Sequence, residues 1–154
     1  MSDPFRPPTA DLRQPADGSL YSVHGIVIAS VLGSLAAGVV ILYLNYRTLG
    51  RTQLAQRWAL WGAGIYTVLI AIAALLPGTG AVVVAYNVFQ AVVAYVLAKQ
   101  LQGAAITYHR TQGGSIHSNV RAAGVGLLTG IVLLFVLVFA TALWGQLTGT
   151  LPAV

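Results

Sequence analysis

The chain has 154 residues, of which 57% are hydrophobic and 7% charged, with no cysteine. Soluble domains carry roughly 25% charged residues, and a core of this size cannot bury so much apolar side chain. The composition therefore excludes a soluble enzyme, a disulfide-linked secreted scaffold and a disordered protein. It predicts a protein that is solvated by lipid.

A polar segment at residues 1–20 contains four prolines, and we expect it to be disordered. Four apolar segments follow, each long enough to cross a hydrocarbon layer of about 30 Å as a helix. We predict an all-α, polytopic membrane protein with four transmembrane helices in an antiparallel bundle. The membrane domain covers residues 21–147, and a short tail covers 148–154. The predicted helices cover residues 21–46, 58–76, 81–101 and 122–144.

Glycine, proline and serine mark the ends of these helices. The sequence Pro-Gly-Thr-Gly at residues 77–80 predicts a tight turn that makes the second and third helices antiparallel neighbours. The third helix meets no strong breaker before Gly113 and Gly114, so it is expected to project beyond the membrane. Ser118 or Asn119 is expected to cap the fourth helix.

The charges predict how the chain is threaded through the membrane. All three acidic residues precede Gly18, so the rest of the chain carries only cations. By the positive-inside rule, the first and third connections lie in the cytoplasm. Both termini then face the periplasm of a bacterial inner membrane. We interpret six cations as topology signals and as contacts for anionic headgroups of the lipid bilayer, not for nucleic acid: Arg47, Arg51, Arg57, Lys99, Arg110 and Arg121.

The residue types present argue against catalysis. General acid–base chemistry and proton-coupled transport usually need a carboxylate, and none follows Asp17. The predicted threading puts His24 near the outer surface and His109 and His117 in a cytoplasmic connection. On that basis His24 cannot share a haem iron with the other two histidines. His109 and His117 alone, without a carboxylate or thiolate, would make a poor zinc site, so we predict no cofactor.

A few polar side chains within the predicted helices form the one candidate site. The predicted threading assigns His24, Asn87 and Gln90 to the outer half of the bilayer, with Tyr86 beside them. Asn87 and Gln90 share a helix face because they are three residues apart. Two interpretations are open. The amides are hydrogen-bonding contacts between helices, or the four residues form a polar vestibule that opens outward for a ligand or an ion.

Gly126 and Gly130 form a GxxxG pair in the fourth helix. Small residues at this spacing let two helix backbones approach closely in lipid. The pair predicts either packing within the chain or the seam of a homodimer.

Two stretches resemble a group of small proteobacterial four-helix integral membrane proteins. The sequence DPFRPPTADL at residues 3–12 is similar to the NPY/F-x-P/A-P-x-A-x-L opening of that group, although Asp3 replaces the usual Asn. The segment NYRTLGR at residues 45–51 is similar to the end of its first helix. The resemblance implies a bacterial inner-membrane protein and carries no assigned activity.

These observations lead to two hypotheses about function. The first is a non-enzymatic accessory or assembly factor that acts through helix and lipid contacts, with a homodimer or another membrane protein as partner. The second is a small permease or channel component whose path uses the polar vestibule.

Overall fold

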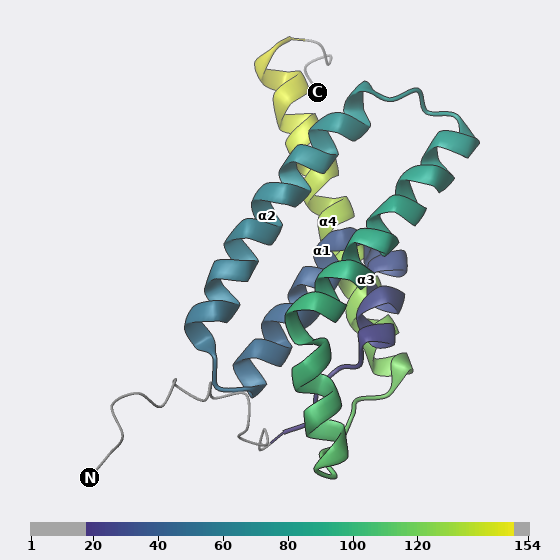
Figure 1. Ribbon diagram of the computed structural model, residues 1–154. Coiled ribbons are helices and arrows are strands. Elements are labelled where there is room, and N and C mark those ends of the chain that lie inside the picture. Colours follow the sequence, from purple (N-terminus) through teal and green to yellow (C-terminus); the bar gives the residue numbers. More distant parts are fainter. Residues whose placement is uncertain (1–17, 150–154) are drawn as a thin grey trace, which may run out of the picture.

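The computed structural model describes residues 18–149, and these residues form four α-helices (Figure 1). Each helix is long and apolar enough to span a membrane, so the prediction of an all-α, multi-pass membrane protein is confirmed. Residues 1–17 of the expected tail at 1–20, and residues 150–154, lie outside the described part. The helices are α1 (Val23–Thr48), α2 (Thr52–Leu75), α3 (Gly80–Thr111) and α4 (Asn119–Leu147).

The helix ends follow the predicted signals. Ser118 caps α4 by accepting a hydrogen bond from the Arg121 amide, at 3.3 Å. At the end of α3, Gly113 has φ +78°, and the Gly114 amide donates to the His109 carbonyl at 2.9 Å. This is a Schellman motif, which needs a left-handed residue at its first position outside the helix. The predicted extension of the third helix is confirmed, since α3 ends at Thr111.

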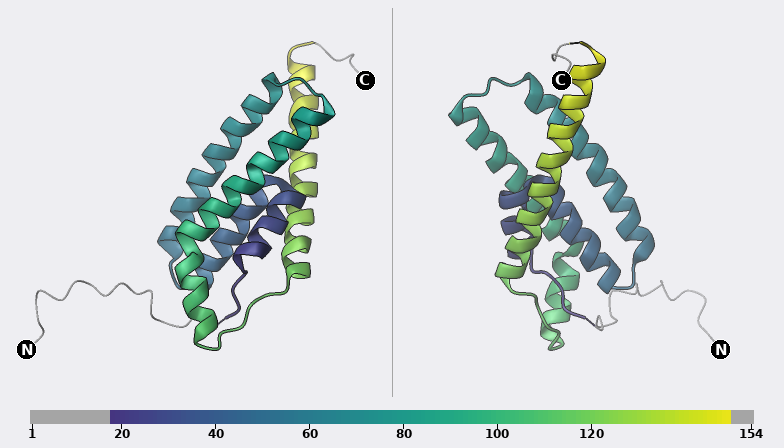
Figure 2. Two further views of the ribbon diagram at one scale, coloured as in Figure 1. Left: turned by 45° about the vertical axis from the view of Figure 1, so that its right-hand side comes forward. Right: turned by 180° about the vertical axis from the view of Figure 1, so that it is seen from behind.

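Helix α1 is not straight, because its backbone leaves the helical conformation at Gly33 and Ser34. Ser34 has φ 65° and ψ 179°, a region that is essentially restricted to glycine. The two parts of α1, residues 23–32 and 35–48, run back along one another (Figures 1 and 2). We call this element the α1 hairpin.

Contacts between the two arms establish the hairpin. The Tyr21 amide donates to Asn45 Oδ1 at 2.8 Å, although a straight helix would separate these residues by about 36 Å. A Cβ atom added at Gly38 would lie 2.2 Å from Ser30 Oγ on the opposite arm. Gly38 therefore allows the arms to approach closely. The arms are about 15 and 21 Å long, so the tip reaches only partway through a bilayer.

The α1 hairpin is the centre of the fold, and each of the other helices packs against it. Over half of the most apolar stretch of α1 is buried, against less than a fifth for α2, α3 and α4. The predicted antiparallel bundle therefore takes the form of three helices around a hairpin. Helices α2 and α3 are joined by a short turn but make little contact with one another.

The α1 hairpin changes the predicted threading. The first arm of α1 begins, and the second arm ends, at the end of the molecule that holds the α1–α2 and α3–α4 connections. We call this end of the molecule the cationic end. The Leu20 amide donates to the Ser115 carbonyl in the α3–α4 connection at 3.1 Å, so the described chain starts at this end. It finishes with Gly149 at the opposite end, which we call the far end (Figure 1). The described residues therefore start and finish at opposite ends of the molecule, whereas the predicted threading has residues 21–46 cross the bilayer once.

Candidate functional site

The structure does not bring the four predicted vestibule residues together. His24 lies in the first turn of α1, at the cationic end, and its side chain is exposed. Tyr86, Asn87 and Gln90 lie in the first three turns of α3, which start from the far end. The predicted grouping placed His24 at the level of the amides by assuming that α1 crosses the membrane. The α1 hairpin removes that assumption.

The three α3 residues have different roles. Gln90 is buried, and its Oε1 accepts a hydrogen bond from the Leu35 amide at 2.9 Å. The Tyr86 hydroxyl donates to the Leu69 carbonyl of α2 at 2.9 Å. Asn87 is exposed and donates to Val83 within its own helix. The interpretation of the amides as contacts between helices therefore holds for Gln90 and not for Asn87.

Gln90 holds the tip of the α1 hairpin. The second arm starts at residue 35, and the first amides of a helix have no partner within it. Gln90 supplies an acceptor for one of them, at a depth where no water is expected. The Ser34 hydroxyl lies at the same tip, buried and without a hydrogen-bond partner. The tip thus combines a strained residue, an unpaired hydroxyl and the start of a helix.

A second group of amides closes the base of the α1 hairpin, where Asn45 and Gln102 are both buried. Asn45 accepts from the Tyr21 amide and donates to the Tyr21 carbonyl at 3.0 Å. It also donates to Gln102 Oε1 at 2.9 Å, and Gln102 donates to the Leu42 carbonyl at 2.8 Å. These bonds tie the entry of the first arm, the exit of the second arm and α3 together.

The sequence contained a signal for this group that the sequence analysis missed. Gln90, Ala94, Ala98 and Gln102 follow one another at four-residue spacing, and all four are buried against α1. Small and amide side chains at this period indicate a helix face that contacts another backbone closely. Gln102 lay just beyond the predicted end of the third helix and was not considered as part of its buried face.

Gly126 and Gly130 pack within the chain. A Cβ atom at Gly126 would lie 2.7 Å from the Ala29 carbonyl oxygen, and one at Gly130 would lie 3.2 Å from that of Leu32. Both carbonyls belong to the first arm of the α1 hairpin. In this structure both glycines pack against the first arm of α1, as the interpretation of packing within the chain expects.

The cationic end holds a polar hollow of about 400 Å³, whose lining includes His24, Arg110, His117 and Ser118. His24 and His117 thus lie at the same end, which corrects their predicted separation. The pKa of His117 is lowered, first by burial and then by the Arg121 guanidinium. The His117 ring contacts the Tyr21 ring, with centroids 4.5 Å apart and an interplanar angle of 53°, and its Nδ1 lies 3.4 Å from Arg121 Nη1.

His109 belongs to the packing of this end. It is only 2% exposed, and its Nε2 donates to the Ser115 carbonyl at 3.1 Å. A Cβ atom at Gly114 would overlap the ring, so Gly114 is needed for this contact. The bond fixes the α3–α4 connection, which in turn holds Leu20 through two backbone hydrogen bonds.

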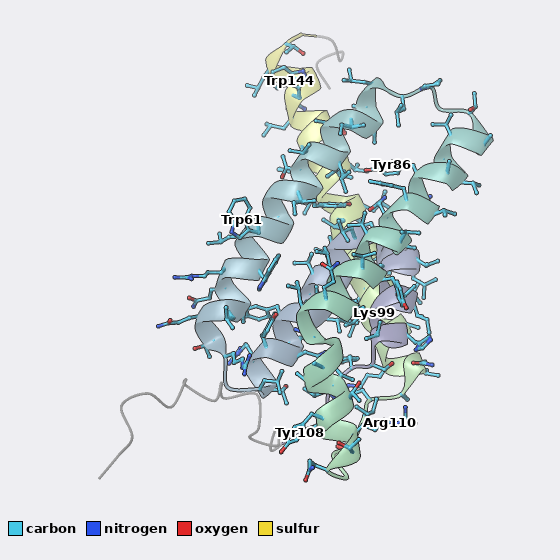
Figure 3. All side chains as sticks on the ribbon, viewed as in Figure 1. Trp61, Tyr86, Lys99, Tyr108, Arg110 and Trp144 are labelled. Atoms are coloured by element: carbon cyan, nitrogen blue, oxygen red, sulfur yellow. The ribbon has the colours of Figure 1, made fainter. Side chains whose placement is uncertain are left out.

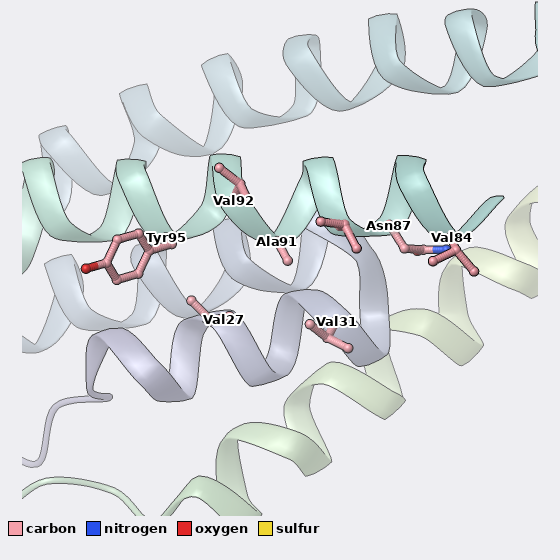
Figure 4. Close-up of a pocket in the computed structure, with 8 residues that line it drawn as sticks. Val27, Val31, Val84, Asn87, Ala91, Val92 and Tyr95 are labelled. Carbon is pink, nitrogen blue, oxygen red and sulfur yellow. The ribbon is translucent and has the colours of Figure 1, made fainter. Parts of the chain in front are cut away.

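An apolar groove of about 400 Å³ runs between the first arm of α1 and α3 (Figure 4). Val27 and Val31 line it from α1, and Val88 and Ala91 are among the residues that face them from α3. At Tyr95 the groove meets a larger hollow of about 740 Å³, which His24 and Lys99 line. Lys99 Nζ lies 5.6 Å from the centre of the Tyr95 ring.

The six predicted cations all lie in the half of the molecule toward the cationic end, and Figure 3 labels Lys99 and Arg110 among them. Within residues 18–149, no group of three or more His, Cys, Asp or Glu side chains is arranged to hold a metal ion.

Comparison with protein families, curated proteins and solved structures gives no match.

Proposed function

We propose that the protein is a non-enzymatic accessory or assembly factor of a bacterial inner membrane, which acts by docking its far end onto helices of a partner. The observation that supports this most is the difference between the two ends. The α1 hairpin fills the space between α2, α3 and α4 toward the cationic end, and its tip stops partway. Beyond the tip these three helices have no central element (Figure 2).

The surfaces of the far end suit contacts with other helices. Phe135, Phe139 and Leu143 on α4 are all exposed, as is Leu75 at the end of α2. Exposed apolar residues in lipid are ordinary by themselves. Here they accompany exposed small residues on α3, Ala81 and Ala85, whose spacing allows close approach of another helix.

The charges support an orientation for this docking. The cations gather at the cationic end, and the positive-inside rule then places that end in the cytoplasm. The N-terminal side of α1 is therefore cytoplasmic, and residue 149 faces the periplasm. The far end lies in the outer leaflet, so the partner contact is an outer-leaflet contact.

Site-specific photo-crosslinking tests this proposal. A benzoylphenylalanine at Phe139 of the far end, 71% exposed, is compared in cells with one at Leu60 of the cationic half, 75% exposed. We expect a protein adduct of defined mass at residue 139 and none at residue 60. The adduct mass distinguishes a second copy of the chain from another membrane protein. Lipid adducts alone at both positions would contradict the proposal.

The tip of the α1 hairpin favours a second candidate, a small permease or channel component. Irregular backbone at membrane depth occurs where it is buried in protein or lines a water-filled path, and broken helices mark the sites of many transporters. In this alternative the path passes Ser34 and Gln90, and His24 is not part of it.

Cysteine accessibility separates the two candidates. Because the chain contains no cysteine, single variants such as Ser34→Cys and Asn87→Cys can be interpreted directly. A path for ions or solutes predicts that a membrane-impermeant thiol reagent modifies residue 34 in intact cells. If residue 34 stays unmodified while Gly78→Cys in the α2–α3 turn reacts, the permease candidate fails.

A further inference from the structure

We propose that the groove between the first arm of α1 and α3 is a binding site for one anionic phospholipid, with an acyl chain along the groove and the phosphate beside Lys99. The inference goes beyond the proposed function and is independent of the docking of a partner at the far end. It names the class of lipid and the residues that select it.

The shape of the groove suits an acyl chain. Its lining is almost wholly apolar, and its volume of about 400 Å³ lies in the range of small-molecule sites. Valines from both helices form its walls, Val27 and Val31 on one side and Val84 and Val88 on the other (Figure 4). The groove runs about 17 Å along α3, from Tyr95 on the side of the cationic end to Val84 near the far end.

Depth places the headgroup at Lys99. If Gly80 marks the far surface of the hydrocarbon layer, Lys99 lies about 29 Å along α3, which matches the layer's thickness of about 30 Å. His24 lines the same hollow as Lys99, so the start of α1 is at this level too. A lipid with its chain in the apolar groove therefore brings its phosphate to these two residues.

Charge selects an anionic lipid. No acidic residue follows Asp17 in the sequence, so no carboxylate from residues 18–149 neutralises Lys99. The Lys99 ammonium lies over the Tyr95 ring, at the point where the apolar groove meets the polar hollow. Arg110 extends the positive charge into the neighbouring hollow, which also contains His24. A cation near an anionic surface contributes about 1 kcal/mol to lipid binding.

The groove on the other side of the α1 hairpin provides a comparison. It has a similar volume of about 430 Å³ and is lined by residues of α1, α2 and α4, including Val39, Tyr43 and Tyr66. Neither groove has a cation in its own lining, and Arg47 lies over the Tyr43 ring at 5.9 Å much as Lys99 lies over Tyr95. The first groove differs because it shares Tyr95 with the hollow that Lys99 and His24 line, so we expect the stronger headgroup preference there.

Native mass spectrometry of the full chain in dodecyl maltoside tests the proposal, with dioleoyl phosphatidylglycerol and dioleoyl phosphatidylcholine as probes. We expect one phosphatidylglycerol to bind about fivefold more tightly than phosphatidylcholine, the factor that about 1 kcal/mol gives. Lys99→Gln should abolish this preference. Arg57→Gln is the matched control because Arg57 is an exposed cation on α2 that lines neither the groove nor the two hollows.

Groove-filling variants and a competition experiment test the proposal further. Ala91→Trp fills the groove and should remove the bound lipid, and circular dichroism checks that this variant keeps its helices. If it unfolds, Val88→Phe takes its place. Equal losses in Lys99→Gln and Arg57→Gln would overturn the proposal in favour of general surface charge. Competition by glycerol phosphate as effective as that by the lipid would overturn the role of the acyl chain.

These outcomes are separate from those of the proposed function. Loss of the lipid preference leaves the crosslink at Phe139 unaffected if the docking proposal is correct. Absence of that crosslink has no bearing on the groove, because Phe139 lies on the exposed surface of α4 and does not line it.

Discussion

The two ends of this molecule are built from similar apolar helices but are stabilised differently. At the cationic end, two arms of α1 fill the space between α2, α3 and α4, and buried amides bind their backbones. At the far end the same three helices continue without a central element (Figure 1). The comparison shows that an apolar sequence sets where a chain meets lipid, whereas a few small and polar residues decide which parts pack tightly. We therefore expect the stability of the fold to depend on the packing around the α1 hairpin, and contacts with partners to depend on the far end.

The largest expected effect concerns Gly126. A Leu side chain there would collide with the backbone of Ala29, and overpacking of this kind typically costs up to about 3 kcal/mol. Gly126→Leu should therefore lower the free energy of unfolding, measured by sodium dodecyl sulfate titration in mixed micelles, by about that amount. Gly124→Leu is the control, because nothing lies within 4 Å of a Cβ atom at Gly124. Equal losses in the two variants would show that α4 does not pack on the α1 hairpin through Gly126.

The next effect tests the amides at the base of the α1 hairpin. Asn45→Ala leaves the Tyr21 amide and carbonyl without their side-chain partner, and unsatisfied buried groups cost about 1–3 kcal/mol. The same titration should show a loss in this range. Asn87→Ala removes an exposed amide that bonds only within its own helix, so it should change stability by less than about 0.5 kcal/mol. A loss for Asn87 as large as that for Asn45 would contradict the assignment of their roles.

Replacing Ser34 is expected to have a smaller effect on the free energy of unfolding, and in the opposite direction. Its φ of 65° is strained for a side-chain-bearing residue and suits glycine, so Ser34→Gly should stabilise the protein by about 1 kcal/mol. Ser34→Ala removes the unpaired hydroxyl and keeps the strain, which separates the two contributions. If Ser34→Gly destabilises the fold, then the turn at the tip does not have this conformation.

The smallest effect is a dependence on pH at the cationic end. The pKa of His117 is lowered by burial and by Arg121, so the unfolded chain binds a proton more readily than the folded one. Its contribution to stability is therefore constant above the ordinary histidine pKa of about 6.5 and falls as the pH drops below it. Thermal unfolding at pH 7.5 and 5.5 should show a decrease that is smaller in His117→Gln. An identical decrease in the variant would assign the effect to other groups.

Much of the fold could be predicted from the sequence, because hydropathy and length identify helices in lipid directly. The Gly113 turn and the Ser118 cap were also predicted, since both follow from local backbone chemistry. The α1 hairpin was not. Gly33 and Ser34 interrupt a continuous apolar run, but their composition is compatible with a straight helix of small residues. What favours folding back is distant in sequence: the Gln90 acceptor for Leu35, and Asn45 for Tyr21.

The candidate site was predicted less well for the same reason. Assigning His24 to the outer leaflet assumed that residues 21–46 form one continuous helix, whereas α1 folds back at Gly33 and Ser34. Gln90 was identified as a polar residue at depth, while its partner is a backbone amide that only the break at Ser34 makes available. Lys99 was interpreted as a topology signal, and its position at the mouth of a groove depends on the first arm of α1 lying beside α3.

The most direct test of the account measures one distance within α1. Spin labels on cysteines at His24 and Arg47, both exposed, would be about 35 Å apart on a straight helix, as would labels at Val120 and Leu143 on α4. The α1 hairpin predicts a distance by double electron–electron resonance well below that of the α4 pair. Equal distances for the two pairs would show that α1 is a straight helix, and would contradict the α1 hairpin and the orientation inferred from it.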